Sequence, residues 1–561
     1  MNSFISLISK KKINHILRLE KENKCNYKEL INNYLVIKSN TIKKFEKDKG
    51  LFESNNLVIF IEGVILNLKS LFLEYKFDNL ETLIEGMYFK DGEKFFNRFR
   101  GSFCGLIYDK RDGRTIVFTN HIGDKQVFFY EHEDFIVVSS NIDNINRFLK
   151  DNNVKITLNE NAAYELLTYG FMTGSNTLIK EISKLEAGTY IKFNEKLEIY
   201  RYHKFTNELI KDITEDEAID RIDILFRNAV KMEFEKDLEY GYKHLCNLSG
   251  GLDSRMINCV ARDLGYDNIL NITYCKNNYL DELIAKQIST DLGNEFLFKS
   301  LDDVSFIYDI DDVVRKNGAM SCYSALTGGK NFFETINFSR YGLNHTGQLG
   351  DVVIGTFCTK AKHLKPINIL GTYSNILIDK LDKKHLNKYE SEEIYQFYTR
   401  GFTGCLNSHS LTQEFTEVSS PFLDIDLMEF CLSINPEMRI NHNLYIKWIM
   451  KKYPNASKYK WEKIDGKIYT NKKLLKIKSK IKRSIISIIN GQSEFYNMNP
   501  FEYWYKTNIN MSRFMDKYFK DNIEKLNNNK ELKEDAIKMY NTADAREKTQ
   551  VLTLLAFLKV F

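Results

Sequence analysis

Residues 244–255 read His-Leu-Cys-Asn-Leu-Ser-Gly-Gly-Leu-Asp-Ser-Arg, and this stretch decides the fold of the second half of the chain. A short apolar segment leads into a Ser-Gly-Gly turn, after which apolar residues recur at helical spacing. Glycine lets the backbone approach a ligand closely, and the N–H groups and dipole of a helix N-terminus favour negative charge. We therefore predict a strand, an anion-binding loop and a helix start. The loop comprises Leu248, Ser249, Gly250, Gly251, Leu252, Asp253 and Ser254.

The order Ser-Gly-Gly-Leu-Asp-Ser at 249–254 is narrower than general glycine richness. It resembles the pyrophosphate-binding loop of the ATP pyrophosphatases, enzymes that cleave ATP between its α and β phosphates. The alternative is an ordinary strand-to-helix turn in which Asp253 or Ser254 caps the helix. Because the six-residue string follows a predicted strand, the nucleotide loop is favoured.

The composition is typical of a globular protein, because 43% of the residues are hydrophobic and 28% are charged. The length of 561 residues suggests roughly two to four domains. A net charge of +5 does not indicate a nucleic-acid partner, and no apolar run approaches the about 18 residues that span a bilayer. The first residues lack the order of a secretory signal. Nine cysteines without CxxC spacing are expected to be reduced thiols, so we predict a cytoplasmic protein without a membrane partner.

Residues 1 to about 200 contain β-branched and aromatic runs that are separated by turns, a pattern typical of strands. Two further segments, 79–96 and 161–169, have apolar residues at helical spacing. By themselves these patterns indicate an α+β domain. The predicted strands are 57–61, 104–108, 115–119, 127–130 and 135–139.

From about residue 215, helices alternate with short apolar strands, which predicts a doubly wound parallel sheet. In such a sheet, ligands bind at the carboxyl ends of the strands, where the Ser249 loop lies. Thr273 at the end of the next strand is a candidate to line an adenine pocket, with a plain core strand as the alternative. The predicted elements are helices 215–235, 254–264 and 280–292, strands 242–248 and 269–274, and a strand near Phe296.

The succession of short segments in the first half is similar to the N-terminal glutaminase-type domain of the asparagine synthetase family. Those segments are 58–63, 100–103, 108–109, 125–130, 167–171 and 183–190. The Ser249 loop stands where that family's synthetase domain begins, and the resemblance covers about residues 50–467. It implies an α/β protein with an N-terminal Ntn-hydrolase-like α+β sandwich (1–205) and an adenine-nucleotide α-hydrolase-like domain of the ATP-pyrophosphatase type (206–470). A helical C-terminal extension of the synthetase domain is predicted over 471–561.

The first domain departs from the family at the residues that handle glutamine. The family's nucleophile is a cysteine at the processed N-terminus, whereas this chain has Asn2 and Ser3, and its first cysteine is Cys25. The family's Asn-Gly pair reads Glu62-Gly63, and Arg100 replaces an aspartate that would hold the substrate amine. We predict that this domain does not hydrolyse glutamine.

A second signature, Leu-Asn-His-Thr-Gly-Gln-Leu-Gly-Asp at 343–351, resembles the family's second nucleotide loop. It implies that Thr346, Gly347 and Gln348 contact the nucleotide. Displacing pyrophosphate from ATP needs Mg²⁺, which prefers a few carboxylates together with phosphate oxygens. Asp253 and Asp351 are therefore the predicted metal ligands, although Asp351 alone could be an ordinary turn aspartate.

The resemblance also suggests three catalytic side chains. Gln348 stands where the family has an acidic residue, and Glu417, in a segment like the family's Glu-x-Arg-x-Pro-Phe-Leu-Asp, either replaces that acid or only braces the loop. Lys463 corresponds to the family lysine that reaches the reaction centre, where an ammonium would stabilise negative charge on the α-phosphate. Lys447 is the third candidate, with solvated surface as its alternative. The acidic residues 281–282 and the lysines of 472–483 are interpreted as solvated helix faces.

Together, these residues imply an asparagine synthetase-like ligase that uses ATP and Mg²⁺ to adenylate a small-molecule or peptide carboxylate and then forms an amide. The amine would come from free ammonia, from a separate glutaminase or from the substrate itself. The last source is that of β-lactam synthetases and lasso-peptide cyclases, and sugar acids are further candidate substrates. An ATP pyrophosphatase acting on RNA and an inactive scaffold are the alternatives of another class. The sequence leaves a homodimer open.

Overall fold

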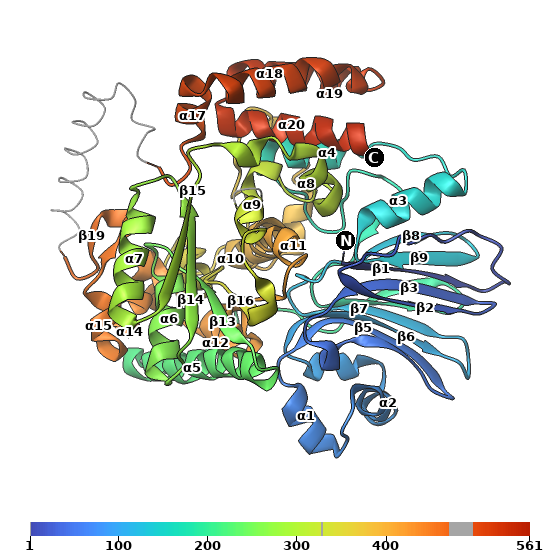
Figure 1. The fold of residues 1–561 in the computed structure, drawn as a ribbon, viewed down its shortest axis with the longest axis horizontal. Helices are drawn as coiled ribbons and strands as arrows, with labels where there is room; N and C mark the ends of the chain where they lie inside the picture. The colour runs from blue at the N-terminus through green and yellow to red at the C-terminus, as the bar shows by residue number, and fades with distance from the viewer. Residues whose placement is uncertain (1, 327–328, 471–496) are drawn as a thin grey trace.

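The computed structural model describes residues 2–326, 329–470 and 497–561, and its first half consists of four layers (Figure 1). Two six-stranded antiparallel sheets pack face to face. The first has the order β10-β8-β9-β1-β3-β2, with β1 Ser3–Ser9, β2 Cys25–Ile31, β3 Leu35–Ile42, β8 Phe128–Glu131, β9 Phe135–Ser139 and β10 Ser183–Lys184. The second has the order β12-β11-β7-β6-β5-β4, with β4 Gly50–Glu53, β5 Leu57–Ile65, β6 Gly101–Asp109, β7 Thr115–Thr119, β11 Thr189–Phe193 and β12 Leu197–Arg201.

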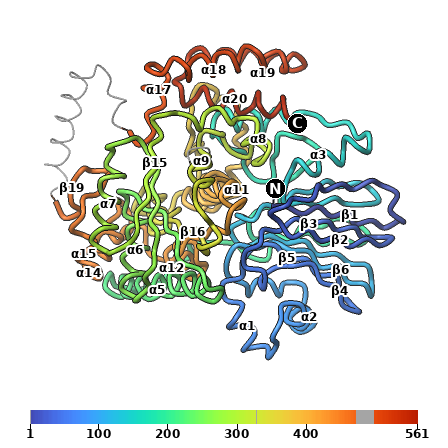
Figure 2. The backbone as a smooth tube through the Cα atoms, in the orientation of Figure 1, coloured from blue at the N-terminus to red at the C-terminus, as the bar shows by residue number. Residues whose placement is uncertain are grey.

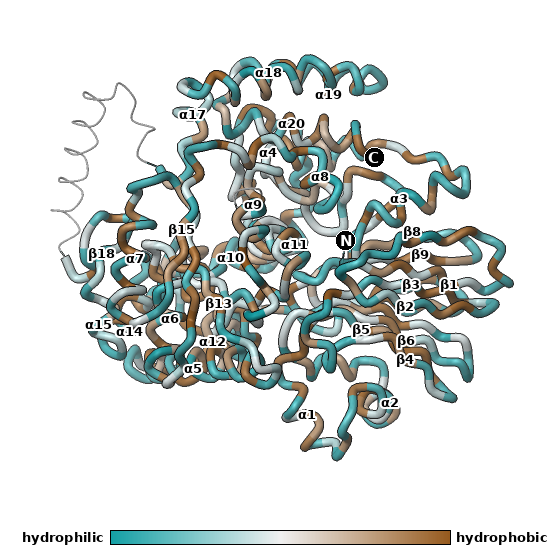
Figure 3. Tube along the Cα trace, viewed as in Figure 1, coloured by the Kyte–Doolittle hydropathy of each residue, from teal (hydrophilic) through white to brown (hydrophobic). Residues whose placement is uncertain are grey.

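Both faces of these sheets are covered, so alternate residues of one strand enter different cores. In β5, Val58 and Phe60 lie between the sheets, whereas Ile59 and Ile61 face α1 Leu68–Tyr75 and α2 Leu80–Asp91. On the opposite side, Ile5 and Leu7 of β1 pack with α3 Ile142–Asp151 and α4 Glu160–Tyr169. The inner strands are accordingly hydrophobic along most of their length (Figure 3). This arrangement confirms the predicted Ntn-like sandwich.

The predicted elements of this half are all present, with two differences. Strands β1, β2 and β3 lie in the first 50 residues, for which no strand was predicted, and β1 is central in its sheet. The predicted helix 79–96 is divided into α2 and a 3₁₀ helix, Gly92–Arg98. Gly92 has a φ of 78°, which glycine adopts without a steric penalty and which ends the α-helix.

The second half contains the predicted parallel sheet, in the order β15-β14-β13-β16-β17. Its strands are β13 Lys243–Asn247, β14 Ile269–Cys275, β15 Glu295–Ser300, β16 Tyr341–His345 and β17 Val418–Ser419. Helices α5 Glu215–Glu239, α6 Asp253–Asp263 and α7 Leu280–Leu292 cover one face, and α9 Lys330–Phe333 covers the other. The chain leaves β13 toward β14 and later returns to β16 on its other side. The loops after β13 and β16 therefore lie at a topological switch point, where such sheets bind ligands.

Buried charges join the two halves. The Lys44 ammonium donates to the carbonyls of Phe338 and Tyr341, at 2.5 Å each. Lys236 of α5 pairs with Asp48 at 3.1 Å, and both side chains are fully buried. The short segment that precedes β4 therefore inserts into the second half.

The last described residues form α17 Phe501–Thr507, α18 Ile509–Asn522, α19 Lys530–Thr542 and α20 Ala545–Val560. Helix α20 packs on α4 and on α8 Ile310–Asn317, so it bridges the two halves (Figures 1 and 2). Within the described residues, no helix is long and apolar enough to cross a membrane. All nine cysteines are unpaired. The lysine-rich run 472–483 lies outside the described residues.

Candidate functional site

The Ser249 loop joins β13 to α6 at the carboxyl edge of the parallel sheet. Helix α6 begins without a side-chain cap, so the alternative of an ordinary capped turn is not what the structure contains. The Gly250 N–H donates to Asp281 Oδ1 at 2.7 Å, and the Ser249 N–H donates to Ser254 Oγ at 3.0 Å. A carboxylate oxygen is therefore already bound by the backbone of the loop, in the way that a phosphate oxygen could be. Asp281 is a buried partner of this loop rather than a solvated helix residue.

The second loop, Thr346–Asp351, follows β16 and lies against the first loop. A Cβ atom on Gly347 would lie 2.5 Å from the Ser254 nitrogen, and one on Gly350 would lie 2.7 Å from Asp253 Cγ. Neither position has room for a side chain, because the backbone of the second loop touches the start of α6. The glycines of the second signature are thus explained by this contact between the loops, whereas a Cβ atom on Gly250 of the first loop would lie 2.7 Å from Glu462 Cβ.

The two predicted metal ligands meet at this contact. Asp253 accepts a hydrogen bond from the Tyr445 hydroxyl at 2.7 Å and another from the Asp351 backbone N–H. Burial and the nearby Asp351 carboxylate raise the pKa of Asp253. Burial alone would also raise the pKa of Asp351, but His442 and Lys463 lower it. Two partly buried carboxylates that repel each other at a strand-end loop form a donor set that fits Mg²⁺.

Lys463 is brought to the same place by Arg255. The Arg255 guanidinium is fully buried and donates to the carbonyl oxygens of Gly250 and Ala456, each at 3.2 Å. Glu462 adds a backbone hydrogen bond to the Gly250 carbonyl at 3.1 Å. These bonds hold the segment of Lys463 beside the first loop, and the Lys463 ammonium lowers the pKa of both Asp253 and Asp351.

The remaining nucleotide candidates lie at the same edge of the sheet. Thr273 at the end of β14 donates its hydroxyl to the Leu248 carbonyl at 2.5 Å. Thr346 is bound through its backbone N–H to the Ser419 carbonyl at 2.8 Å. The Gln348 amide donates to Ser408 Oγ at 2.7 Å, and its Oε1 atom accepts no hydrogen bond from the described residues.

Glu417 and Lys447 are placed elsewhere. Glu417 is fully buried between Lys49 and Lys125 of the first half, with N–O distances of 2.8 Å to each. Burial alone would raise the pKa of Glu417, but the ammonium groups of Lys125 and Lys49 lower it to about 2. This is the bracing role that the sequence left open. Lys447 lies on α14 Asn443–Lys452 and pairs with Glu215 at the surface, so its contacts favour the solvated alternative.

Sequence reasoning missed Arg255, Tyr445 and Glu462. Arg255 directly follows the Ser-Gly-Gly-Leu-Asp-Ser string, so its position was a usable signal. Tyr445 lies on α14, far along the chain from Asp253, and no local pattern marks it. Glu462 precedes Lys463, and its carboxylate accepts the Tyr279 hydroxyl at 2.7 Å.

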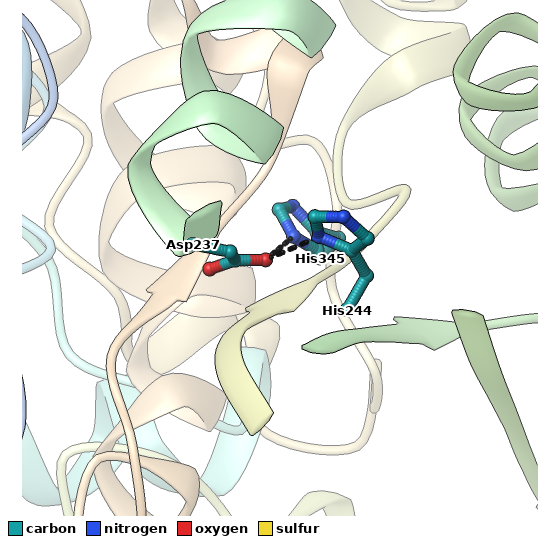
Figure 4. Close-up of side chains that lie close together, drawn as sticks. All are labelled: Asp237, His244 and His345. Carbon is teal, nitrogen blue, oxygen red and sulfur yellow. Dashed lines mark hydrogen bonds and ion pairs between the residues drawn. The ribbon is translucent and has the colours of Figure 1, made fainter. Parts of the chain in front are cut away.

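A buried cluster of Asp237, His244 and His345 lies under the second loop (Figure 4). Its three candidate ligand atoms lie within 4.8 Å of one another. Asp237 Oδ2, however, is already shared by both imidazoles, at 2.8 Å from His244 Nδ1 and 2.7 Å from His345 Nε2. His345 Nδ1 bonds to Glu233 at 2.8 Å. We interpret this cluster as a hydrogen-bonded support for β16 and the loop that follows it.

The positions of the first half that the family resemblance predicts would bind glutamine are occupied by charged side chains with partners of their own. Glu62 is buried and accepts from Ser140 Oγ at 3.1 Å, and Lys125 lies 4.0 Å away. A cavity of about 40 Å³ remains beside Asn2, Glu62 and Lys125. Arg100 points to Asp426 of the second half at 3.4 Å. A cavity of this size holds a few water molecules at most.

In a comparison with known proteins, one family model matches part of the chain. Residues 51–206 match the family described as a glutamine amidotransferase domain, so the first half contains an amidotransferase-type domain. No curated protein matches the chain. Among solved structures, the glutamine phosphoribosylpyrophosphate amidotransferase from B. subtilis is 10% identical over 54% of this chain and 85% of its own, with a TM-score of 0.25. The glutamine-dependent NAD⁺ synthetase from Acinetobacter baumannii is 14% identical over 54% and 68%, with a TM-score of 0.18. The NMN synthetase from Francisella tularensis is 15% identical over 39% and 94%, with a TM-score of 0.19.

Because the two loops are in contact, we predict that Gly347→Ala lowers both the stability of the protein and its affinity for Mg-ATP. The added methyl group would push the second loop away from α6, so we expect a loss of about 1–3 kcal/mol in the free energy of unfolding and weaker binding of Mg-ATP. Urea unfolding and calorimetric titration measure these effects. Gly401→Ala is the matched control, because its Cβ would find its nearest neighbour at an ordinary 3.5 Å. Equal behaviour of the two variants would contradict the contact.

The bracing role of Glu417 predicts that Glu417→Gln acts on stability. The substitution leaves Lys49 and Lys125 buried with less compensation, so the free energy of unfolding should fall by about 3–5 kcal/mol in urea. Lys451→Gln, which breaks a surface pair with Asp216, should leave it nearly unchanged. A variant of normal stability that no longer releases pyrophosphate from ATP would instead support a catalytic role.

The cluster beneath the second loop predicts a loss of stability in alkaline solution. Burial alone would lower the pKa of His345, but the carboxylates of Asp237 and Glu233 raise it from its usual 6.5 to about 9. The imidazolium therefore contributes up to about 3 kcal/mol below pH 6.5, and this contribution is lost as the pH rises through 9. Urea midpoints between pH 6 and 9.5 should fall more steeply for the wild type than for His345→Gln. Parallel profiles would refute this assignment.

Proposed function

We propose that this protein is an ATP-dependent amide ligase that forms AMP and pyrophosphate and resembles asparagine synthetase. The observation that supports it best is the meeting of Asp253, Asp351 and Lys463 at the contact between two glycine loops. Two acidic groups and one ammonium at the carboxyl edge of a parallel sheet suit the binding of a polyphosphate with its metal ion. The amidotransferase-type domain of the first half fits the same class.

In this proposal, a substrate carboxylate attacks the α-phosphate of ATP, and pyrophosphate leaves into the Ser249 loop. The backbone N–H of Gly250 would exchange the Asp281 carboxylate for a phosphate oxygen. Mg²⁺, held by Asp253 and Asp351, would neutralise charge on the phosphates. Lys463 would stabilise the additional negative charge at the α-phosphate and then at the tetrahedral intermediate. An amine finally displaces AMP and forms the amide.

We propose further that the amine does not come from glutamine hydrolysis in the first half. The cavity of about 40 Å³ beside Glu62 has room for only a few water molecules and is too small for glutamine. Burial raises the pKa of Glu62, and this carboxyl is engaged by Ser140 and Lys125. Free ammonia, a separate glutaminase or an amine of the substrate are the remaining sources.

The test is pyrophosphate release from Mg-ATP with aspartate plus ammonia, aspartate plus glutamine, and larger acids with ammonia. We expect no stimulation by glutamine, and a loss of at least about 100-fold in Asp253→Asn, in Asp351→Asn and in Lys463→Met. Lys447→Met is the matched control and should retain its rate, because this lysine lies at the surface. Pyrophosphate release that depends on glutamine would contradict the proposal that the first half does not hydrolyse glutamine. Release that is unaffected by Asp253→Asn would refute the proposed site.

A further inference from the structure

The described residues surround a cavity of about 580 Å³ next to the second loop. Gln348 forms part of its wall, and Cys405 lies within electrostatic reach of Asp351. The cavity therefore borders the site where the acyl-adenylate would form. Its opposite wall is built by residues of the C-terminal helices, including Arg546 and Gln550 of α20. The C-terminal extension thus helps to build the site, a role that its sequence did not indicate.

Two arginines give the cavity a positive side. Arg546 stacks on the Tyr373 ring at 4.7 Å, and Arg400 lies near the same tyrosine hydroxyl. Among the described residues, neither guanidinium has a carboxylate within ion-pair distance. The two acidic residues of this wall, Asp544 and Glu547, are engaged with each other's backbone N–H groups at the start of α20. The guanidinium groups are therefore available to a carboxylate or another anionic group.

The cavity also offers hydrogen-bond acceptors that have no donor. Gln550 is 2% exposed, and its Oε1 atom accepts no hydrogen bond from the described residues. Gln348 Oε1 is in the same situation at the other wall. An unpaired buried acceptor costs free energy, so a rotation of either amide toward the cavity that lets its oxygen accept from an N–H donor of a ligand would be favoured.

The size and lining of the cavity fit a ligand larger than aspartate. Cavities of roughly 300–1,000 Å³ bury drug-sized ligands. Part of the cavity wall is apolar and aromatic. They include Phe171, Tyr274, Leu301, Phe306 and Phe501.

We propose that this cavity binds the carboxylate substrate, and that the substrate is an acylated or peptide-like acid with a second anionic group. This inference rests on the proposed function. The second anionic group binds Arg400 and Arg546, the apolar body packs on the aromatic wall, and an amide N–H donates to Gln550. The reacting carboxylate then lies toward Gln348 and Asp351.

Calorimetric titration of the full chain with N-benzoyl-L-aspartate tests this site without requiring turnover. We expect binding that is at least about tenfold tighter than that of L-aspartate, because burying an aromatic ring stabilises the complex. Arg400→Gln and Arg546→Gln should each weaken it by roughly tenfold, and Gln550→Leu by several fold. N-benzoyl-L-alaninamide, which lacks the carboxylates, should bind weakly. Arg221→Gln, on the exposed face of α5, is the matched control and should have no effect.

Absence of binding, equal binding of L-aspartate, or affinities unchanged in both arginine variants would overturn the inference. Weaker binding of AMP in Arg546→Gln, with no binding of the benzoyl acid, would assign the cavity to the nucleotide and also overturn it. Failure of the proposed function is distinguishable, since it would leave this binding intact while every acid fails to release pyrophosphate. Conversely, release with aspartate and ammonia but no binding of the benzoyl acid would overturn only this inference.

Discussion

The close approach of two backbone segments organises the second half of this protein. Gly347 and Gly350 lie against Asp253 and Ser254 so tightly that a single methyl group at either glycine would collide. This contact brings Asp253 and Asp351, which are 98 positions apart in sequence, into one partly buried acidic site. Arg255 then fixes the Lys463 segment to the same loop through carbonyl oxygens. The charges proposed to act on ATP thus depend on backbone packing.

Buried ion pairs between charged side chains join the two halves. Lys49, Lys125 and Glu417 form one buried group, and Asp48 with Lys236 forms another. Burying ions is costly unless each finds a partner, so this interface favours one arrangement of the halves over others. Lys125 and Glu62 take part in this network at the position that the family resemblance predicts would bind glutamine. We infer that the first half has a structural role here.

The C-terminal helices connect the same two halves from another side. Helix α20 buries most of its length against α4 and α8, and its residues Arg546 and Gln550 face the cavity beside the second loop. The substrate site proposed above therefore contains residues from widely separated parts of the chain. Its charge and size argue for an acid larger than aspartate.

By local spacing and turn chemistry, the sequence by itself determined an α+β first half, a parallel sheet in the second half and the glycine loop at Ser249. The Ntn-like sandwich, the second loop and the proposed metal ligand Asp351 followed from the resemblance to the asparagine synthetase family. The β14 and α7 boundaries, for example, follow directly from apolar periodicity. Only the tertiary structure decided the place of Glu417, since nothing near it in sequence reveals that two lysines of the first half surround it. The same holds for Tyr445 and Arg546. Their roles arise from packing between distant segments, which local sequence patterns do not encode.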